Sequence, residues 1–217
     1  MPRKSKSLDE ATPEAIARAG LAIISEKGGS ELSFRAIANY LEVSHTTVVR
    51  RGGGDFAGLL DLLADHLADS LPVIPAGSGE WAELTERRFT ALYELLGTRP
   101  GLVLLRGSRS WFGPRILSRL TEPQLADNLA LGLTVDDALL AYREMYLYTL
   151  GCAALIEHRD RKTVRLRTRS ALAALDPEEF PVLGTHLETV AQLTVSDDIF
   201  CDGLRRLITS WAAAPKS

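Results

Sequence analysis

A short stretch near the N-terminus brings together side chains that could form hydrogen bonds with a nucleic acid. Residues 44–55 have the sequence SHTTVVRRGGGD, in which hydroxyl groups and an imidazole precede two arginines and three glycines. Hydroxyl and imidazole groups donate and accept hydrogen bonds, and a guanidinium presents five donors in a fixed fork. On the outer face of a helix, such groups could contact phosphates or base edges, and an arginine could bind guanine through two hydrogen bonds.

Residues 33–51 have the layout of a helix-turn-helix motif, which would position these groups. A helix of about two turns begins after Ser33, a tight turn follows at Glu42 and Val43, and Ser44 caps a second helix. In such motifs the N-terminal end of the second helix enters the major groove, which a helix of ~10–12 Å diameter fits. The alternative is a bundle of short helices with ordinary caps, because Ser and Thr cap helices in many proteins.

Further helices are predicted on both sides of the motif. Residues 12–14 (TPE) form a helix start, with an N-cap residue, a proline and an acid in the first turn, and Gly28 is placed to end that helix. The glycines at 52–54 precede a leucine-rich helix capped by Asp55. These glycines could suggest a phosphate-binding loop, but no strand precedes them and no lysine follows, so we interpret them as a flexible junction.

The rest of the chain is also expected to be helical. Prolines and glycines between residues 72 and 79 mark a break, so we predict two domains, 1–71 and 72–217. Residues 101–106 are expected to form a short apolar turn or helix, and the arginine-rich segment 159–175 a solvated loop rather than a nucleic-acid patch. Helical periodicity predicts an all-α second domain with helices over 81–96, 114–131 with a bend at Pro123, 136–158, 177–191 and 197–212.

Composition and charge narrow the class of protein. The chain has 217 residues, 46% of them hydrophobic, which is enough to bury a core, and no apolar run approaches the ~18 residues of a membrane span. The basic N-terminus has no apolar stretch behind it, so we expect no signal peptide. Cys152 and Cys201 fall within apolar helical patterns, which favours reduced thiols in a cytoplasmic protein.

The charge balance requires any nucleic-acid-binding surface to be local. The net charge is −3, and residues 1–70 carry 8 Lys and Arg against 10 Asp and Glu. Positive charge is nevertheless concentrated in the leading tail, at Arg3, Lys4 and Lys6, and at the end of the quoted stretch, at Arg50 and Arg51. A basic face on an otherwise acidic protein is compatible with DNA binding.

Catalytic and metal-binding motifs are not found in the sequence. No pair of the four histidines stands at i, i+4 spacing, and there is no CxxC, G-x-S-x-G, P-loop or Rossmann fingerprint. We therefore expect no enzyme activity, no cofactor and no metal site.

Two ordered sets of segments carry a family resemblance. TPEAIARAGLAIISEKG, LSFRAIANYLEVSHTTVVRR and LLDLLADHLA resemble the DNA-binding domain of the tetracycline-repressor (TetR) family. EWAELTERRFTALYELLGTRPGL, LGLTVDDALLAYREMYLYTLGCAALIEH, DPEEFPVL and IFCDGLRRLITSW resemble the ligand-binding half of the subgroup nearest the tetracycline repressors. The resemblance covers nearly the whole chain. It implies an N-terminal three-helix helix-turn-helix DNA-binding domain and a C-terminal helical domain for ligand binding and dimerisation.

The resemblance implies a repressor that a small-molecule effector releases from a palindromic double-stranded DNA operator. The chain departs from the family pattern at Glu42, where a glycine is usual, at Val49, where a tyrosine is usual, and in lacking a lysine at the start of the fourth helix. These departures motivate an alternative function, an all-α small-molecule-binding protein with weak or lost DNA binding. The DNA-contacting positions implied by the resemblance are Arg35, Ser44, His45, Thr46, Thr47, Arg50 and Arg51.

The resemblance also implies a homodimer and an effector pocket. Helices 136–158 and 197–212 would pair with their copies and hold two DNA-binding domains ~34–36 Å apart, although they could instead fill the core of a monomer. Three arginines and two aromatic residues among the pocket positions suggest an anionic or oxygen-rich, partly aromatic ligand. Arg106 and Leu155 replace the His and Glu of the tetracycline–Mg²⁺ site, so that ligand is not expected. The implied pocket positions are Arg88, Leu92, Arg106, Ser110, Trp111, Gln124, Leu139, Arg143, Tyr146 and Leu155.

Overall fold

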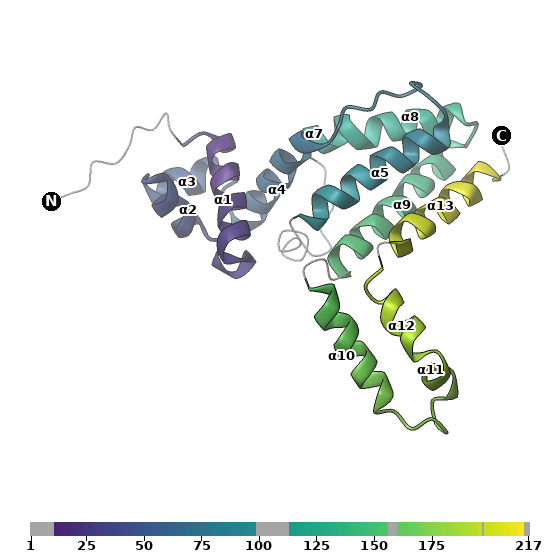
Figure 1. The fold of residues 1–217 in the computed structure, drawn as a ribbon. Helices are drawn as coiled ribbons and strands as arrows, with labels where there is room; N and C mark the ends of the chain where they lie inside the picture. Colours follow the sequence, from purple (N-terminus) through teal and green to yellow (C-terminus); the bar gives the residue numbers. More distant parts are fainter. Residues whose placement is uncertain (1–10, 99–112, 156–159, 197, 215–217) are drawn as a thin grey trace.

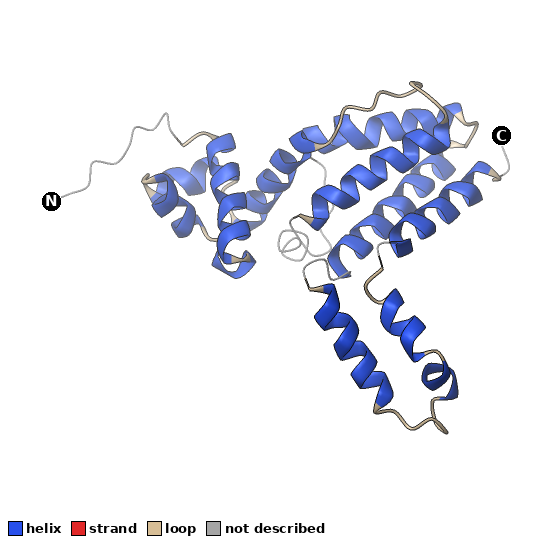
Figure 2. Cartoon of the chain, in the orientation of Figure 1, coloured by secondary structure: helices blue, strands red, loops and turns tan. Residues whose placement is uncertain are grey.

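The fold is all-α, as the sequence predicted. The structure is a computed structural model that describes residues 11–98, 113–155, 160–196 and 198–214. Every secondary-structure element within these ranges is a helix (Figure 2). The chain forms three parts: a small N-terminal bundle, a larger bundle of long helices, and an arm, inserted before the last helix, that projects from the larger bundle (Figure 1).

The N-terminal bundle contains the predicted helix-turn-helix. It consists of α1 (Pro13–Lys27), the short η2 (Gly29–Glu31), α2 (Phe34–Leu41), α3 (His45–Arg51) and α4 (Phe56–Leu67), followed by η3 (Ala68–Ser70). A single apolar cluster joins these helices, and its fully buried members include Ile16, Ile37, Val48, Leu59 and Leu63. Short helices such as α3 are marginal in isolation, so this shared core must stabilise them.

Local capping sets the helix boundaries of the N-terminal bundle. The hydroxyl of Thr12 accepts a hydrogen bond from the Ala15 amide at 3.2 Å, and Gly28 ends α1 with φ of 91°. The other predicted caps also form, each accepting from the amide three residues later, at 3.0 Å for Ser33, 3.2 Å for Ser44 and 2.7 Å for Asp55. Each cap satisfies an amide that has no partner within its own helix.

Long helices form the second bundle. It contains α5 (Trp81–Gly97), α7 (Pro114–Ile116), the π-helical turn η4 (Leu117–Thr121), α8 (Glu122–Ala130), α9 (Val135–Leu155) and α13 (Asp198–Ala212). Helices α5, α9 and α13 pack against one another, and α8 packs on α9 (Figure 1). Their shared core includes Phe89, Leu92, Met145, Phe200 and Leu204.

The helix changes type just before Pro123, where the sequence predicted a bend. Residues 117–121 form a π-helical turn, and Pro123 lies in the first turn of α8 directly after it. Proline has no amide hydrogen and its ring clashes with the carbonyl four residues earlier, so a regular α-helix cannot run through this point. The wider π-helical turn accommodates the proline.

The arm differs from the prediction. Segment 159–175 was expected to be a loop, but Arg161–Ala173 forms helix α10, capped by Asp160, whose carboxylate accepts from the Thr163 amide at 3.1 Å. The prediction was wrong because it relied on charge, whereas arginine is a good helix former. The helix expected over 177–191 is divided at His186 into α11 (Pro181–Thr185) and α12 (Leu187–Leu193). Segment 101–106 and the predicted end of helix 136–158 lie outside the described residues.

Candidate nucleic-acid interface and ligand region

The first turn of α3 presents polar side chains to the outside. Ser44, His45 and Thr46 are exposed there, and Arg50 is exposed in the last turn of the same helix. Val48 lies between them in sequence and is completely buried, so it anchors the opposite face of α3 in the core. Helix α3 lies at the end of the molecule that is remote from the long helices (Figure 1).

Two of these polar groups are held in place by local contacts. The hydroxyls of Ser44 and Thr47 lie 2.7 Å apart, so Thr47, which is half-buried, shares in the cap of α3. The His45 ring meets the Phe34 ring edge to face, with centroids 6.3 Å apart. These contacts restrict the side chains without using all of their hydrogen-bonding capacity.

Helix α2 contributes further exposed groups. Arg35 is exposed, as expected for a predicted DNA contact. Asn39 and Tyr40, which were not among the predicted contacts, are exposed as well, Tyr40 by 52% of its surface. The sequence did contain an indication for Tyr40, because an aromatic residue on the polar side of an amphipathic helix is unusual. Large rings are more often buried.

Arg51 forms a contact within the N-terminal bundle. Its guanidinium is half-buried and donates through Nη1 to the carbonyl of Ala11 at 3.2 Å. Ala11 is fully buried and directly precedes Thr12, the N-cap residue of α1. Arg51 therefore ties the end of α3 to the beginning of α1, and its contact with DNA remains a prediction.

Glu42 adopts the left-handed conformation in the turn of the motif. Its φ and ψ are 58° and 35°, and it is the one non-glycine residue with positive φ among the described residues. The amide of Val43 donates to the carbonyl of Ala38 at 3.0 Å, which is a typical way to end a helix such as α2. A side chain with a β-carbon is strained in this region, so the position favours glycine.

The predicted ligand residues fall into three groups. Arg106, Ser110 and Trp111 lie outside the described residues. Leu139, Arg143 and Leu155 are exposed along α9. The remaining four are buried inside the second bundle, namely Arg88, Leu92, Gln124 and Tyr146. The structure therefore does not gather all ten around one described cavity.

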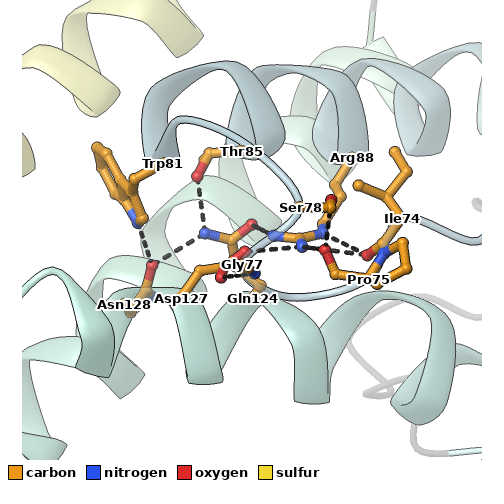
Figure 3. Close-up of polar contacts among 10 residues, drawn as sticks. All are labelled: Ile74, Pro75, Gly77, Ser78, Trp81, Thr85, Arg88, Gln124, Asp127 and Asn128. Carbon is orange, nitrogen blue, oxygen red and sulfur yellow. Dashed lines mark hydrogen bonds and ion pairs between the residues drawn. The ribbon is translucent and has the colours of Figure 1, made fainter.

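Arg88 is the centre of a buried polar network (Figure 3). Only 2% of its surface is exposed, and its Nη2 atom lies 2.7 Å from Oδ2 of Asp127. The guanidinium also donates to the carbonyls of Ile74, at 3.1 and 3.3 Å, and Pro75, at 3.1 Å. Its remaining contact is to Oε1 of Gln124 at 3.1 Å.

Gln124 extends this network across the bundle. Its amide nitrogen donates to the Thr85 hydroxyl at 2.8 Å and to the side-chain oxygen of Asn128 at 2.9 Å. The Trp81 indole donates to the same oxygen of Asn128 at 2.9 Å (Figure 3). Because their polar atoms are occupied within the protein, Arg88 and Gln124 have structural roles, and their contact with a ligand remains a prediction.

Aromatic side chains stack on one another within the second bundle. Tyr93 stacks on Phe200 with ring centroids 3.9 Å apart, and Tyr142 stacks on Tyr146 at 5.7 Å. Burial raises the pKa of Tyr142, although its hydroxyl shares a hydrogen bond of 2.8 Å with Thr121. Tyr146 is therefore the predicted ligand residue that lies among flat apolar surfaces.

Charged residues join the two bundles where α4 meets α7. Oδ1 of Asp65 accepts from the backbone amide of Arg115 at 2.9 Å, and Oδ2 pairs with the Arg115 guanidinium at 2.9 Å. Arg115 also lies 3.0 Å from Asp69, and Arg119 donates to the carbonyl of Leu71 at 2.7 Å. A β-carbon at Gly113 would lie 2.1 Å from Asp65, so the close approach requires glycine there. We call Asp65, Asp69, Arg115 and Arg119 the junction cluster.

The described residues contain neither a metal-binding cluster nor a membrane-spanning helix. No group of three or more His, Cys, Asp or Glu side chains is arranged to hold a metal ion. None of the helices in the same part of the chain combines the length and apolar character needed to cross a membrane.

A three-helix helix-turn-helix bundle, joined through a fourth helix to a larger all-α bundle, defines the class of fold. In the comparison with solved structures, this fold matches that of TetR-family proteins. A TetR-family protein, ActR from Streptomyces coelicolor in complex with actinorhodin, is 21% identical over 93% of this chain and 95% of its own, with a TM-score of 0.79. The chain therefore has the TetR-family fold.

Two further structures support this assignment. A transcriptional regulator from Streptomyces coelicolor, described as a TetR, is 20% identical over 93% of this chain and 98% of its own, with a TM-score of 0.68. A TetR variant from Acinetobacter baumannii AYE in complex with minocycline is 16% identical over 93% and 95% of the two chains, with a TM-score of 0.66. No protein-family model matches the chain, and no curated protein matches it.

Replacing Glu42 by glycine should stabilise the protein. We expect Glu42→Gly to raise the free energy of unfolding by about 0.5–1 kcal/mol. Glycine removes the steric strain of the left-handed conformation, and this gain should exceed the entropic cost of ordering the more flexible glycine on folding. Urea denaturation measures the change. Glu42→Gln is the control, since it removes the charge but keeps the β-carbon, and an equal gain from both variants would contradict the strain argument.

Removing the Asp127 carboxylate should strongly destabilise the second bundle. In Asp127→Ala the Arg88 guanidinium would stay buried without its counterion, so we expect the free energy of unfolding to fall by about 3–5 kcal/mol. Arg205→Ala is the control, because Arg205 forms an exposed pair with Glu86 at 2.9 Å. That control should change stability by about 0.5 kcal/mol or less. If Asp127→Ala lowered the free energy of unfolding no more than Arg205→Ala does, the buried network would not be important for stability.

Proposed function

We propose that the chain is a ligand-responsive DNA-binding transcriptional regulator, and specifically a repressor that a small molecule releases from its operator. The exposed polar turn of α3 carries this proposal. Ser44, His45 and Thr46 stand at the N-terminal end of a helix that Val48 anchors, which is the end that helix-turn-helix proteins place in the major groove. Arg50, on the same helix, can contact a phosphate or a guanine.

A homodimer would place two copies of α3 on successive turns of one face of the DNA. Helix α9 supports this proposal because it exposes leucines although it belongs to the core bundle. Leu140 and Leu147 are about half exposed and stand seven residues apart, so they share one face of the helix. Ile199 of α13 is also partly exposed. An apolar stripe of this kind is typical of a surface that a partner covers.

The effector would bind in the second bundle, beside the stacked rings of Tyr142 and Tyr146. ActR and the TetR variant were solved in complex with actinorhodin and minocycline, respectively. We propose a partly aromatic, oxygen-rich ligand for this chain, because the stacked rings offer flat apolar surfaces. Because Asp127 already neutralises Arg88, that arginine is not used to bind an acidic ligand.

The junction cluster offers a route from the ligand region to the DNA-binding bundle. Asp65 belongs to α4, whereas Arg115 and Arg119 belong to α7 and η4, which precede α8 and the buried network. A shift of α7 would therefore move α4 and change the spacing of the two DNA-binding bundles. A ligand drives such a change only by the difference between its affinities for the two arrangements.

The alternative function, a small-molecule-binding protein without DNA binding, is favoured by one observation. Glu42 places a strained and exposed carboxylate in the turn between α2 and α3. That negative charge would lie near the DNA phosphates and would weaken binding. The alternative keeps the same fold and the same ligand region, so DNA binding itself distinguishes the two functions.

A gel-shift experiment with the DNA upstream of the chain's own gene tests the proposed function. We expect a sequence-selective shift that weakens with salt, and Arg50→Ala should weaken it by about 1–3 kcal/mol. Arg87→Ala is the control, because Arg87 is exposed on α5, away from α3. No shift at any salt concentration would favour the alternative function.

Charged residues on the exposed stripe of α9 should prevent dimer formation. We expect Leu140→Glu/Leu147→Glu to sediment as a monomer, because two carboxylates would have to be buried in the dimer interface. Val73→Glu is the control, since Val73 is 71% exposed in the segment before α5. Sedimentation velocity measures the outcome, and a dimeric double variant would show that α9 does not form the interface.

A further inference from the structure

A groove of about 770 Å³ lies in the arm, between α10, α12 and the start of α13. Its walls carry four cationic side chains and two carboxylates: Arg161, Lys162, Arg165, Arg169, Glu188 and Asp198. The lining therefore has a surplus of positive charge, although the chain as a whole has a net charge of −3. The volume is within the usual range for small-molecule sites.

Three of the arginines are arranged in a row. Arg161, Arg165 and Arg169 are spaced four residues apart on α10, so they point to the same side of the helix. At a rise of 1.5 Å per residue the row extends over roughly 12 Å. A row of guanidinium groups along one wall suits an elongated ligand that carries negative charge.

Two of these arginines, Arg165 and Arg169, already bind a carboxylate of the chain itself. The Glu188 carboxylate is paired with Arg169 through Nε and lies 3.5 Å from Nη2 of Arg165. The hydrogen bond from Arg169 lowers the pKa of the Glu188 carboxyl, and the charges of both arginines act in the same direction. Arg165 and Arg169 thus already form a carboxylate-binding pair, and an external anion would compete with Glu188 for it.

An apolar surface completes the groove. Leu166, which is about half exposed, and Val195, which is buried, both contribute to its lining. Helices α10 and α11 bury no side chain, and α12 buries only Ala191, so the arm has little core of its own. The apolar part of a ligand could therefore cover Leu166 without displacing packed side chains.

We propose that this groove binds a small organic anion with an apolar body, held by Arg165 and Arg169. The site is separate from the ligand region inside the second bundle, because the arm projects away from α5, α8 and α9 (Figure 1). It goes beyond the proposed regulatory function and does not depend on it. Binding is expected to be weak and sensitive to salt, since the arginines are about half exposed.

Calorimetric titration with a matched pair of probes tests this site. Naphthalene-2-sulfonate and naphthalene-2-sulfonamide share an aromatic body, but only the sulfonate has a full negative charge. We expect the sulfonate to bind the full-length protein and the sulfonamide to bind at least about tenfold more weakly. No sulfonate binding, or equal binding of the two probes, would overturn the proposal.

Variants of the arm locate the bound sulfonate. Arg165→Gln/Arg169→Gln should weaken binding by about tenfold or more, whereas Glu188→Gln should strengthen it because the competing carboxylate is lost. Arg167→Gln is the matched control, since Arg167 is exposed on the same helix but does not line the groove. Circular dichroism confirms that each variant is folded.

Two results of the variant series would overturn the proposal. Unchanged sulfonate binding by Arg165→Gln/Arg169→Gln would place the sulfonate elsewhere, for example in the ligand region of the second bundle. Dissociation of a dimer by the same variant, measured by sedimentation, together with unchanged sulfonate binding, would identify the groove as a contact between copies of the chain. DNA binding is measured separately, so its absence would leave the result for the groove unaffected.

Discussion

The buried ion pair between Arg88 and Asp127 is the interaction on which the geometry of the second half depends. Two charges removed from water are stable only if nearly every polar atom finds a partner, and here the guanidinium contacts a carboxylate, an amide oxygen and two backbone carbonyls. Those carbonyls belong to Ile74 and Pro75, so the network fixes the segment that leaves the N-terminal bundle. Oδ1 of Asp127 also accepts from the Gly77 amide at 2.7 Å. The connection between the bundles is thereby held against α5 and α8.

A continuous set of contacts leads from this network to the exposed turn of α3. The chain passes from α8 through η4 to Arg115, which pairs with Asp65 of α4. Helix α4 packs closely on α1, where a β-carbon at Gly20 would lie 2.9 Å from the Leu63 side chain. Helix α1 begins beside Arg51 of α3. This continuity identifies Asp65 and Arg115 as the place where a movement of α7 would reach the N-terminal bundle.

The features that could be predicted most accurately depend on residues close together in the sequence. Caps at Ser33, Ser44 and Asp55 involve amides three residues away, so their local patterns were sufficient to position the helices. Arg88 was different, because its partner Asp127 is 39 residues away and no local pattern shows that the two meet. Helix α10 was missed for a third reason: the arginine run indicates solvation, and solvation is compatible with a helix as well as with a loop.

Some polar side chains of α3 have roles within the protein and others do not. This difference favours the proposed DNA-binding function over the alternative of a small-molecule-binding protein without DNA binding. Ser44 and Thr47 have structural roles in the cap of α3, and Arg51 holds the start of α1. Thr46 and Arg50 differ from them, because among the described residues neither side chain forms a hydrogen bond or an ion pair. The fold would be satisfied by many residue types at these two positions. A hydroxyl and a guanidinium that the protein does not use for its own stability are the groups needed to contact base edges and phosphates.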